Sequence, residues 1–463
     1  MLKTSFIGLF CLTLSGLFAN SAADTTFLTS SIKTAAAVIA LDYSPDGKRL
    51  VTGGQTNEVI VWDAATGKKL MTFKGHTDNV VAVKYSPNAR FIASGGVDNK
   101  TILWDAITGD LLYKVATHRD YVRDIAFSPD NKLLADASWD GTANIYSVLS
   151  GELVTTITAH LDNVTTVAFN PTGTELLTGS GDKSIRAWDT KTWEQKYILN
   201  GHTDEVWDAQ YSSNGKFVAG GAWDNKGRVW ELAQKREIFT FSAHTSDVWA
   251  TGFSPDNQLV VTAGGDRKVY VWDLATGEMV ADLSATIFTA EVECVRFSPD
   301  GKTVAAGSRD GYVRFFRTPS VQERKSAYIK KGLEKWSLKS AYEKTSDYQN
   351  RLEKQEKKGR ELGNDFERRA VDFFADNANW RAMQLQDYNA DQEYYKVLCP
   401  DLGELIIRVP PKDAENFKEN FSQVQIKTPK FVVGKTAIEL DAVEVTVPRG
   451  NEFKSYMMAT PAK

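Results

Sequence analysis

A repeat of 42 residues is the feature that most restricts how this chain can fold. An aromatic residue recurs in one register with five steps of 42 residues and a last step of 44. These aromatic positions are Trp62, Trp104, Tyr146, Trp188, Trp230, Trp272 and Phe316. The same spacing relates all five histidines, His76, His118, His160, His202 and His244, and also Asp98, Asp140, Asp182, Asp224 and Asp266. The aromatic, His and Asp positions share this spacing, and the seven aromatic positions indicate seven copies of one structural unit.

Each unit has the pattern of four short β-strands. In the second unit, apolar runs at 80–85, 91–94, 101–104 and 111–115 are separated by turns rich in Pro, Gly and Asn. Four antiparallel strands cannot bury both of their faces alone, and radial stacking buries them without leaving long open edges. The repeat therefore predicts an all-β, seven-bladed propeller over residues 24–319.

The motifs inside the units resemble those of the WD-repeat family of β-propellers. The chain carries Gly-His pairs at 75–76 and 201–202, and Trp-Asp pairs at 62–63, 104–105, 188–189 and 272–273. The seventh unit reaches Thr318-Pro319 with only three strands. We therefore expect residues 25–32 to supply its fourth strand, as the resemblance implies.

The resemblance also implies a structural role for the histidines. In the family, a His, a Ser or Thr, an Asp and a Trp form a hydrogen-bonded tetrad in each blade. Complete sets occur as His76, Ser94, Asp98 and Trp104; His160, Thr178, Asp182 and Trp188; and His244, Thr262, Asp266 and Trp272. Tyr146 replaces the indole in unit three, Gly220 replaces the hydroxyl in unit five, and units one and seven lack the histidine.

With every histidine in this register, none remains for a metal triad or a nucleophile–base pair, so we predict no catalytic residues, no metal and no cofactor. Glu291 and Glu293 are interpreted as solvated charges on the rim of the ring. The paired glycines lie at strand turns with no helix after them, which does not fit a phosphate-binding loop.

Variation within the repeat indicates where a partner would bind. Large aromatic and arginine side chains occupy positions that hold small residues in other units, and such side chains dominate binding hot spots. The resemblance to the WD-repeat family implies that these positions face the top opening of the ring. The predicted partner-binding residues on this top face are Tyr121, Arg123, Trp139, Trp207, Trp223, Trp249 and Arg309. The alternative is that these indoles pack between blades as part of the core.

Residues 1–23 have the pattern of a cleaved secretory leader, with Lys3, an apolar run from Phe6 to Ala19 and small residues at 21–23. We therefore expect an exported protein of a bacterial periplasm or surface, with no membrane span in the mature chain. The net charge of −4 provides no broad positive field, which argues against nucleic acid as a partner.

The repeat stops after the ring. Residues 320–395 are rich in Lys, Arg, Glu and Gln and lack proline, which predicts a charged helical segment that docks on the ring or on the final module. Residues 396–463 return to strand-like alternation with a short helix near 413–421, which predicts a small β-rich α+β module. We recognise no activity in it.

Two classes of function follow from these patterns. The first is a non-enzymatic, exported scaffold that binds a protein, or an envelope glycan, through the top face of the propeller. The alternative is a propeller enzyme, or a glycan- or small-ligand-binding protein, with its site at the central opening.

Overall fold

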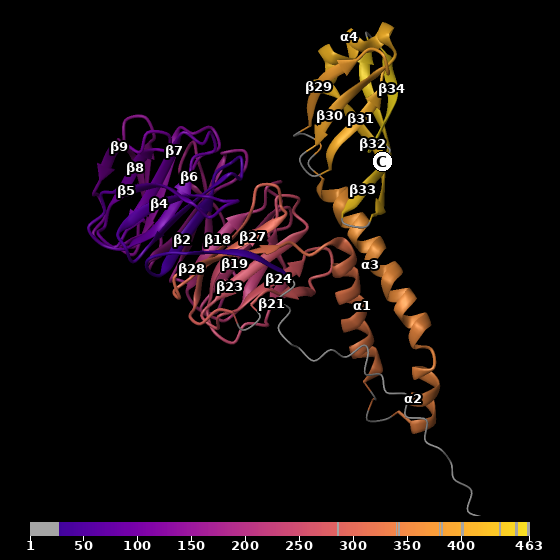
Figure 1. The fold of residues 1–463 in the computed structure, drawn as a ribbon, viewed down its shortest axis with the longest axis horizontal. Coiled ribbons are helices and arrows are strands. Elements are labelled where there is room, and N and C mark those ends of the chain that lie inside the picture. The colour runs from indigo at the N-terminus through magenta and orange to yellow at the C-terminus, as the bar shows by residue number, and fades with distance from the viewer. Residues whose placement is uncertain are drawn as a thin grey trace, which may run out of the picture.

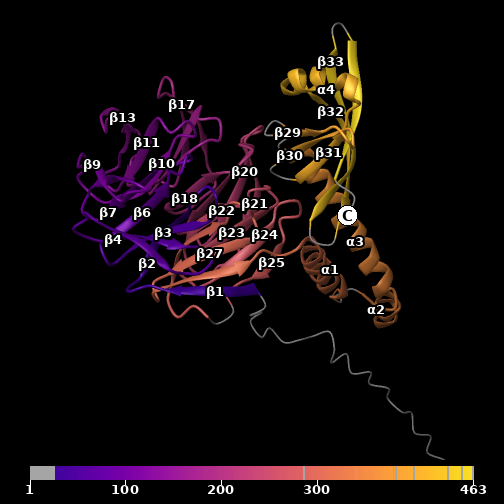
Figure 2. The same cartoon turned by 45° about the horizontal axis from the view of Figure 1, so that its top comes forward.

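The computed structural model describes residues 27–284, 287–338, 340, 343–378, 380, 383–399, 402–434, 437–449 and 452–460. The expected leader at residues 1–23 lies outside these ranges. The described chain forms a ring of seven four-stranded antiparallel sheets, then three helices, and then a module with a six-stranded sheet and a fourth helix (Figures 1 and 2).

The seven blades are numbered along the chain, each from its innermost strand outward. Blades 1 to 3 are β2 (Val38–Tyr43), β3 (Arg49–Gly54), β4 (Glu58–Asp63) and β5 (Lys69–Lys74); β6 (Val80–Tyr85), β7 (Phe91–Gly96), β8 (Thr101–Asp105) and β9 (Leu111–Val115); and β10 (Val122–Phe127), β11 (Leu133–Ser138), β12 (Ala143–Ser147) and β13 (Leu153–Ile157). Blades 4 to 6 are β14 (Val164–Phe169), β15 (Glu175–Ser180), β16 (Ile185–Asp189) and β17 (Gln195–Leu199); β18 (Val206–Tyr211), β19 (Phe217–Ala222), β20 (Gly227–Glu231) and β21 (Arg236–Phe241); and β22 (Val248–Phe253), β23 (Leu259–Gly264), β24 (Val269–Asp273) and β25 (Met279–Asp282). Blade 7 is β26 (Val292–Phe297), β27 (Thr303–Ser308), β28 (Tyr312–Arg317) and β1 (Leu28–Lys33).

The burial of the strands follows the pattern expected for radially stacked sheets, with buried inner strands and exposed outer strands. Second strands such as β7 and β19 are buried at all six positions because neighbouring blades cover both of their faces. Outer strands such as β9 have no buried residue in a five-residue stretch. Seven blades meet this pattern, so the predicted seven-bladed propeller is confirmed.

The ring closes through its two ends. β1 pairs with β28 in antiparallel register, from Leu28 opposite Phe316 to Lys33 opposite Tyr312. Ile32 is 5% exposed and packs with Val38 of blade 1 and Phe315 of blade 7. The expected fourth strand of blade 7 is therefore present, although it runs over 28–33 rather than 25–32; residues 25 and 26 lie outside the described ranges.

The helical segment starts at α1 (Val321–Ser337) because Ser320 and Glu323 form a reciprocal capping box before it. Arg317 donates to Glu323, and together with Ser320 it lowers the pKa of that carboxyl group to about 2. α2 (Thr345–Leu352) and α3 (Gln355–Asn377) follow, and α3 packs alongside α1 (Figure 1).

The helices dock on blades 5 and 6. The Arg324 guanidinium, 5% exposed, contacts the Asp273 carboxylate at 2.6 Å and donates to Gln258 at 2.8 Å. Asp273 is fully buried. The Phe373 ring of α3 stacks on Phe217 of blade 5, with 5.8 Å between centroids. A buried ion pair, rather than an apolar stripe alone, therefore fixes the helices against the ring.

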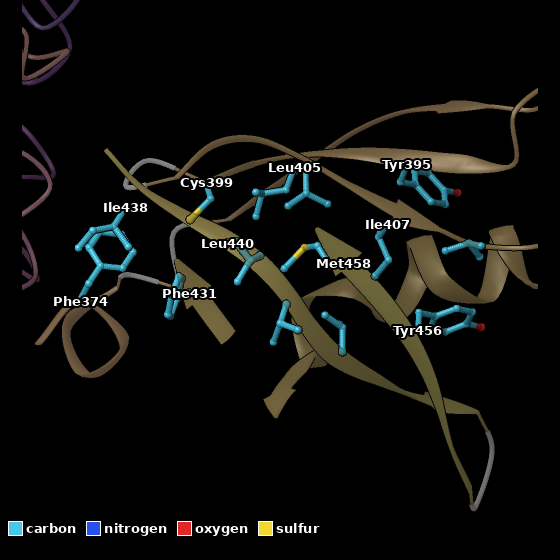
Figure 3. Packing of buried hydrophobic residues seen from close by; sticks show 14 of the residues in the cluster. Phe374, Tyr395, Cys399, Leu405, Ile407, Phe431, Ile438, Leu440, Tyr456 and Met458 are labelled. Atoms are coloured by element: carbon cyan, nitrogen blue, oxygen red, sulfur yellow. The ribbon is translucent and has the colours of Figure 1, made fainter. Parts of the chain in front are cut away.

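The final module is a six-stranded sheet in the order β29-β30-β31-β34-β33-β32. Its elements are β29 (Gln384–Asn389), β30 (Tyr394–Cys399), β31 (Gly403–Arg408), α4 (Pro411–Asn420), η3 (Phe421–Gln423), β32 (Gln425–Val433), β33 (Ile438–Arg449) and β34 (Glu452–Ala459). Phe374 of α3 lies at one end of the core of this sheet, near Phe431, Ile438 and Leu440 (Figure 3).

The strands of this module start at Gln384, earlier than the position 396 predicted from the sequence. β29 has the sequence QLQDYN and no buried residue, because it is an edge strand. Its polar composition resembles that of the helices before it, which hides the strand. Among the described residues, no helix combines the length and the apolar character needed to cross a membrane.

Candidate functional site

The top face of the ring is the end where each outer strand leads into the next inner strand and where the second and third strands turn. Every inner strand starts there with a β-bulge, which inserts one unpaired residue and redirects its side chain. In blade 5, for example, Val206 pairs with Ala222 and Asp208 with Gly221, so Trp207 is the extra residue. The seven bulged residues, which we call the mouth ring, are Ile39, Val81, Arg123, Thr165, Trp207, Trp249 and Glu293.

A second ring of residues lies in the turns between the second and third strands. Its members, which we call the turn ring, are Gln55, Val97, Trp139, Gly181, Trp223, Gly265 and Arg309. The chain holds them in place by backbone hydrogen bonds, such as the one from the Trp223 amide to the Glu205 carbonyl at 2.9 Å. Six of the seven predicted partner-binding residues belong to these two rings, and Tyr121 directly precedes the registered Val122.

Four of the predicted aromatic residues form one continuous array. Tyr121 contacts Trp139 at 5.2 Å between centroids, Trp139 meets Trp207 edge-to-face at 6.0 Å, and Trp207 stacks on Trp223 at 5.2 Å. The contact between Trp139 of blade 3 and Trp207 of blade 5 passes over blade 4. Blade 4 has Gly181 and Thr165 at the corresponding positions, so no large side chain separates the two indoles there.

The two predicted arginines contact this surface in different ways. The Arg123 guanidinium lies over the Trp207 ring at 4.8 Å from its centroid. Arg309 lies over Trp249 at 5.3 Å and is paired with Glu293. Trp249 and Arg309 are therefore joined to each other, and no ring contact among the described residues links them to the four-membered array.

The interpretation of Glu293 as a solvated rim charge is wrong. Glu293 is only 6% exposed. It occupies the bulge position of blade 7, and its carboxylate forms an ion pair with Arg309. A sequence signal for this was available: Glu293 follows the registered Val292 just as Trp207 follows Val206.

The top-face aromatics differ from the repeated tryptophans in burial. Trp62, Trp104, Trp188, Trp230 and Trp272 all belong to the hydrophobic clusters of the blades. Within the described part of the chain, none of those clusters includes Tyr121, Trp139, Trp207, Trp223 or Trp249. Tyr121 and Trp223 are each 37% exposed.

Two indole N–H groups of the array are enclosed without a partner. Nε1 of Trp139 and Nε1 of Trp207 are inaccessible to solvent and have no acceptor among the described residues. Unlike the indoles of the complete tetrads, these two indoles therefore make no hydrogen bond to the ring.

The complete tetrads show the opposite arrangement, in which every donor finds its acceptor. In blade 2, His76 contacts Asp98 through Nδ1 at 2.9 Å and Ser94 through Nε2 at 2.8 Å, and the Trp104 indole donates to Ser94 at 2.8 Å. His160, Thr178, Asp182 and Trp188 of blade 4 are joined in the same way, as are His244, Thr262, Asp266 and Trp272 of blade 6.

Blade 3 departs from the tetrad in a way that the sequence analysis missed. Asp136 occupies the hydroxyl position, so His118 lies between two carboxylates, 2.8 Å from Asp136 and 2.9 Å from Asp140. Burial alone would lower the pKa of His118, but the bonds to both carboxylates outweigh burial and raise it. His160 has one carboxylate partner, and burial lowers its pKa.

We expect Ser94→Ala to destabilise the ring by about 1–3 kcal/mol, because the His76 ring nitrogen and the Trp104 indole would both lose their buried partner. The matched control is Thr52→Val in blade 1, where only the Trp62 indole loses a partner. Urea unfolding measures both variants. An equal loss in the two would show that the histidine contributes nothing to the tetrad.

The central channel below the mouth ring is narrow. It encloses a cavity of about 40 Å³ whose lining includes Arg123, Trp207, Glu293 and Arg296. Sites for small molecules usually measure about 300–1,000 Å³. The cavity therefore has room for only a few water molecules. In the described ranges, no group of three or more His, Cys, Asp or Glu residues is arranged to hold a metal ion.

The fold and the tetrads define a seven-bladed β-propeller built from repeats of one kind. The family model described as "WD domain, G-beta repeat" matches residues 26–63, 67–105, 109–147, 151–189, 193–231, 235–273 and 277–317. These matches cover more than half of the chain, and the protein therefore belongs to the WD40 repeat family. A comparison with curated proteins found no significant match.

The register of the matches explains the closure of the ring. Each matched segment starts with the outer strand of one blade and continues with three strands of the next; residues 67–105, for example, contain β5 and then β6 to β8. The first match therefore starts with the strand that completes blade 7. Propellers of this family commonly serve as non-enzymatic scaffolds that bind protein partners.

Proposed function

We propose that this protein is an exported, non-enzymatic scaffold that binds a protein partner through the top face of its propeller. The observation that carries the proposal is the array of Tyr121, Trp139, Trp207 and Trp223, which is continuous, partly exposed and outside the blade cores. Large aromatic side chains provide much of the binding energy at protein interfaces.

The position of the helices supports this choice of face. α1 and α3 contact Asn214, Gln258 and Asp273, which lie at the turns on the opposite end of the ring. The two ends of the propeller are thus used differently: one end holds the C-terminal part of the chain, and the other presents the aromatic array. Export rests on the leader pattern of residues 1–23.

The test is to replace Trp223 with the photo-crosslinking residue benzoylphenylalanine in the cell that makes the protein. We expect a discrete cross-linked protein partner, identified by mass spectrometry. The matched control places the same residue at Leu149, which is 88% exposed in the turn between β12 and β13, at the end of the ring opposite the top face. Equal cross-linking from both positions, or none from position 223, would contradict the proposed face.

The double variant Trp207→Ala/Trp223→Ala should reduce the free energy of binding to the captured partner by about 2 kcal/mol or more, since hot-spot aromatics contribute on that scale. The reason is that these two stacked rings, 5.2 Å apart, form one half of the array and include its exposed indole, Trp223. Titration of the purified partner measures the loss by calorimetry. Undiminished binding by a correctly folded double variant would exclude the array as the interface.

A further inference from the structure

The surface around the array carries several acidic side chains. On blades 4 to 6, the loops that lead into the inner strands present Asp162, Asp204, Glu205 and Asp247. In the described chain, Asp204 has a cation nearby, Lys183 at 3.8 Å, while no ion pair involves Asp162, Glu205 or Asp247. Glu205 and Asp247 are only partly exposed. Three of these four carboxylates beside the array therefore have no ion-pair partner, although the charge of Lys183 also acts on Glu205.

The pKa values of two of these carboxyl groups are raised, chiefly by burial. Burial raises the pKa of Glu205, the charges of Asp162 and Asp204 raise it further, and Lys183 opposes them. Burial also raises the pKa of Asp247, and the charge of Asp204 raises it further. A cation placed between these carboxylates would relieve both the repulsion and the loss of hydration.

The indole rings of the top face also attract positively charged groups. The face of an indole is the electron-rich side of the ring and binds Lys and Arg side chains. The protein itself uses this contact twice on the top face, with Arg123 over Trp207 and Arg309 over Trp249. Trp223, 37% exposed and flanked by Glu205 in the same blade, has accessible ring surface that none of the described cations covers.

From this charge complementarity we propose that the top-face array binds a Lys- or Arg-bearing segment of the partner protein. The proposal rests on the proposed function and specifies the chemistry of the partner. The cationic side chain would lie against Trp223 near the carboxylates of Glu205 and Asp247, both of which interact with Asp204. The apolar part of the segment would cover Tyr121 and Trp139.

The test uses a displayed library of random 12-residue peptides, selected on the full-length protein and counter-selected on the Trp207→Ala/Trp223→Ala variant. We expect the retained peptides to be enriched in Lys and Arg. Replacing each arginine by citrulline, which keeps the shape and removes the charge, should weaken binding at least tenfold. Neutral or acidic retained peptides, or no retained peptides, would overturn the proposal.

A pair of charge variants locates the site. Glu205→Gln/Asp247→Asn should reduce binding of the selected peptide at least tenfold. The matched control is Glu291→Gln, which removes a carboxylate at the same register in blade 7, away from the array, and should have little effect. Equal losses in the two proteins would overturn the proposal, because they would show that only the overall charge of the ring matters.

Fluorine NMR of protein labelled with 5-fluorotryptophan shows where the peptide binds. The resonances of Trp207 and Trp223 should move, while those of the buried Trp104, Trp188 and Trp272 stay fixed as internal references. If a neutral oligosaccharide moves the same resonances and basic peptides do not, the cationic partner is wrong. If cross-linking from position 223 succeeds but the charge variants bind normally, the proposed function stands and this inference fails.

Discussion

Trp104→Ala should destabilise the propeller by about 3–5 kcal/mol, the range usual for truncating a buried tryptophan. The Trp104 side chain is 2% exposed, stacks on Phe73 at 5.4 Å between centroids and donates its indole proton to Ser94. Its removal leaves a cavity in blade 2 and takes the indole donor away from Ser94. The loss is measured by urea unfolding followed by circular dichroism.

The matched control is Trp223→Ala, which removes the same side chain from the top face. Because Trp223 is 37% exposed and lies outside the blade cores, we expect its replacement to change the free energy of unfolding by less than about 1 kcal/mol. The two variants together separate the tryptophans that build the ring from those available for binding. Similar losses of stability in both would assign the top-face array to the core.

Arg324→Met should also cost about 3–5 kcal/mol, because it leaves the Asp273 carboxylate buried without its cation. Asp273 keeps its hydrogen bonds to Thr276, so the turn of blade 6 should survive. The expected result is that α1 separates from the ring, which lets water reach the carboxylate. Hydrogen exchange of residues 321–337 and urea unfolding measure the two effects.

Lys335→Met is the control for this second variant. It removes an exposed partner of Glu278, at 3.0 Å, on the same helix, and such pairs contribute about 0–1 kcal/mol. Slow hydrogen exchange in α1 that persists in Arg324→Met would show that the apolar contacts of α3, such as Phe373 on Phe217, hold the helices without the buried pair.

The ring could be predicted from the sequence because the same pattern of residues occurs in every blade. Seven registered aromatics required seven similar sheets, and the missing fourth strand of unit seven required one from elsewhere, which β1 supplies. The first strand of the final module could not be found in this way. β29 occurs once, lies at an edge and has the polar composition of a helix.

The candidate site was only partly predictable, for a related reason. Variation at fixed positions of the repeat identified Trp207 and Trp223, but contacts between blades do not follow the repeat. The Trp139–Trp207 contact depends on small residues in the blade between them, and the burial of Glu293 depends on Arg309. Asp136 stands at the hydroxyl position of the same register that revealed Gly220, so this replacement could have been found from the sequence, whereas its effect on the His118 pKa required the contact between the two side chains.

The pairing of β1 with β28 has a consequence for the order of assembly. Thr29 donates to the Phe315 carbonyl across 286 positions of sequence, whereas the other six blades pair strands that are adjacent in the chain. Contacts this distant form slowly, since the intervening chain must first be ordered. During synthesis, blades 1 to 6 can form as they emerge, while the first strand waits without a partner until the last blade is made. The unpaired edges of β1 and β28 are thus exposed for longest during folding, and unpaired strand edges favour aggregation.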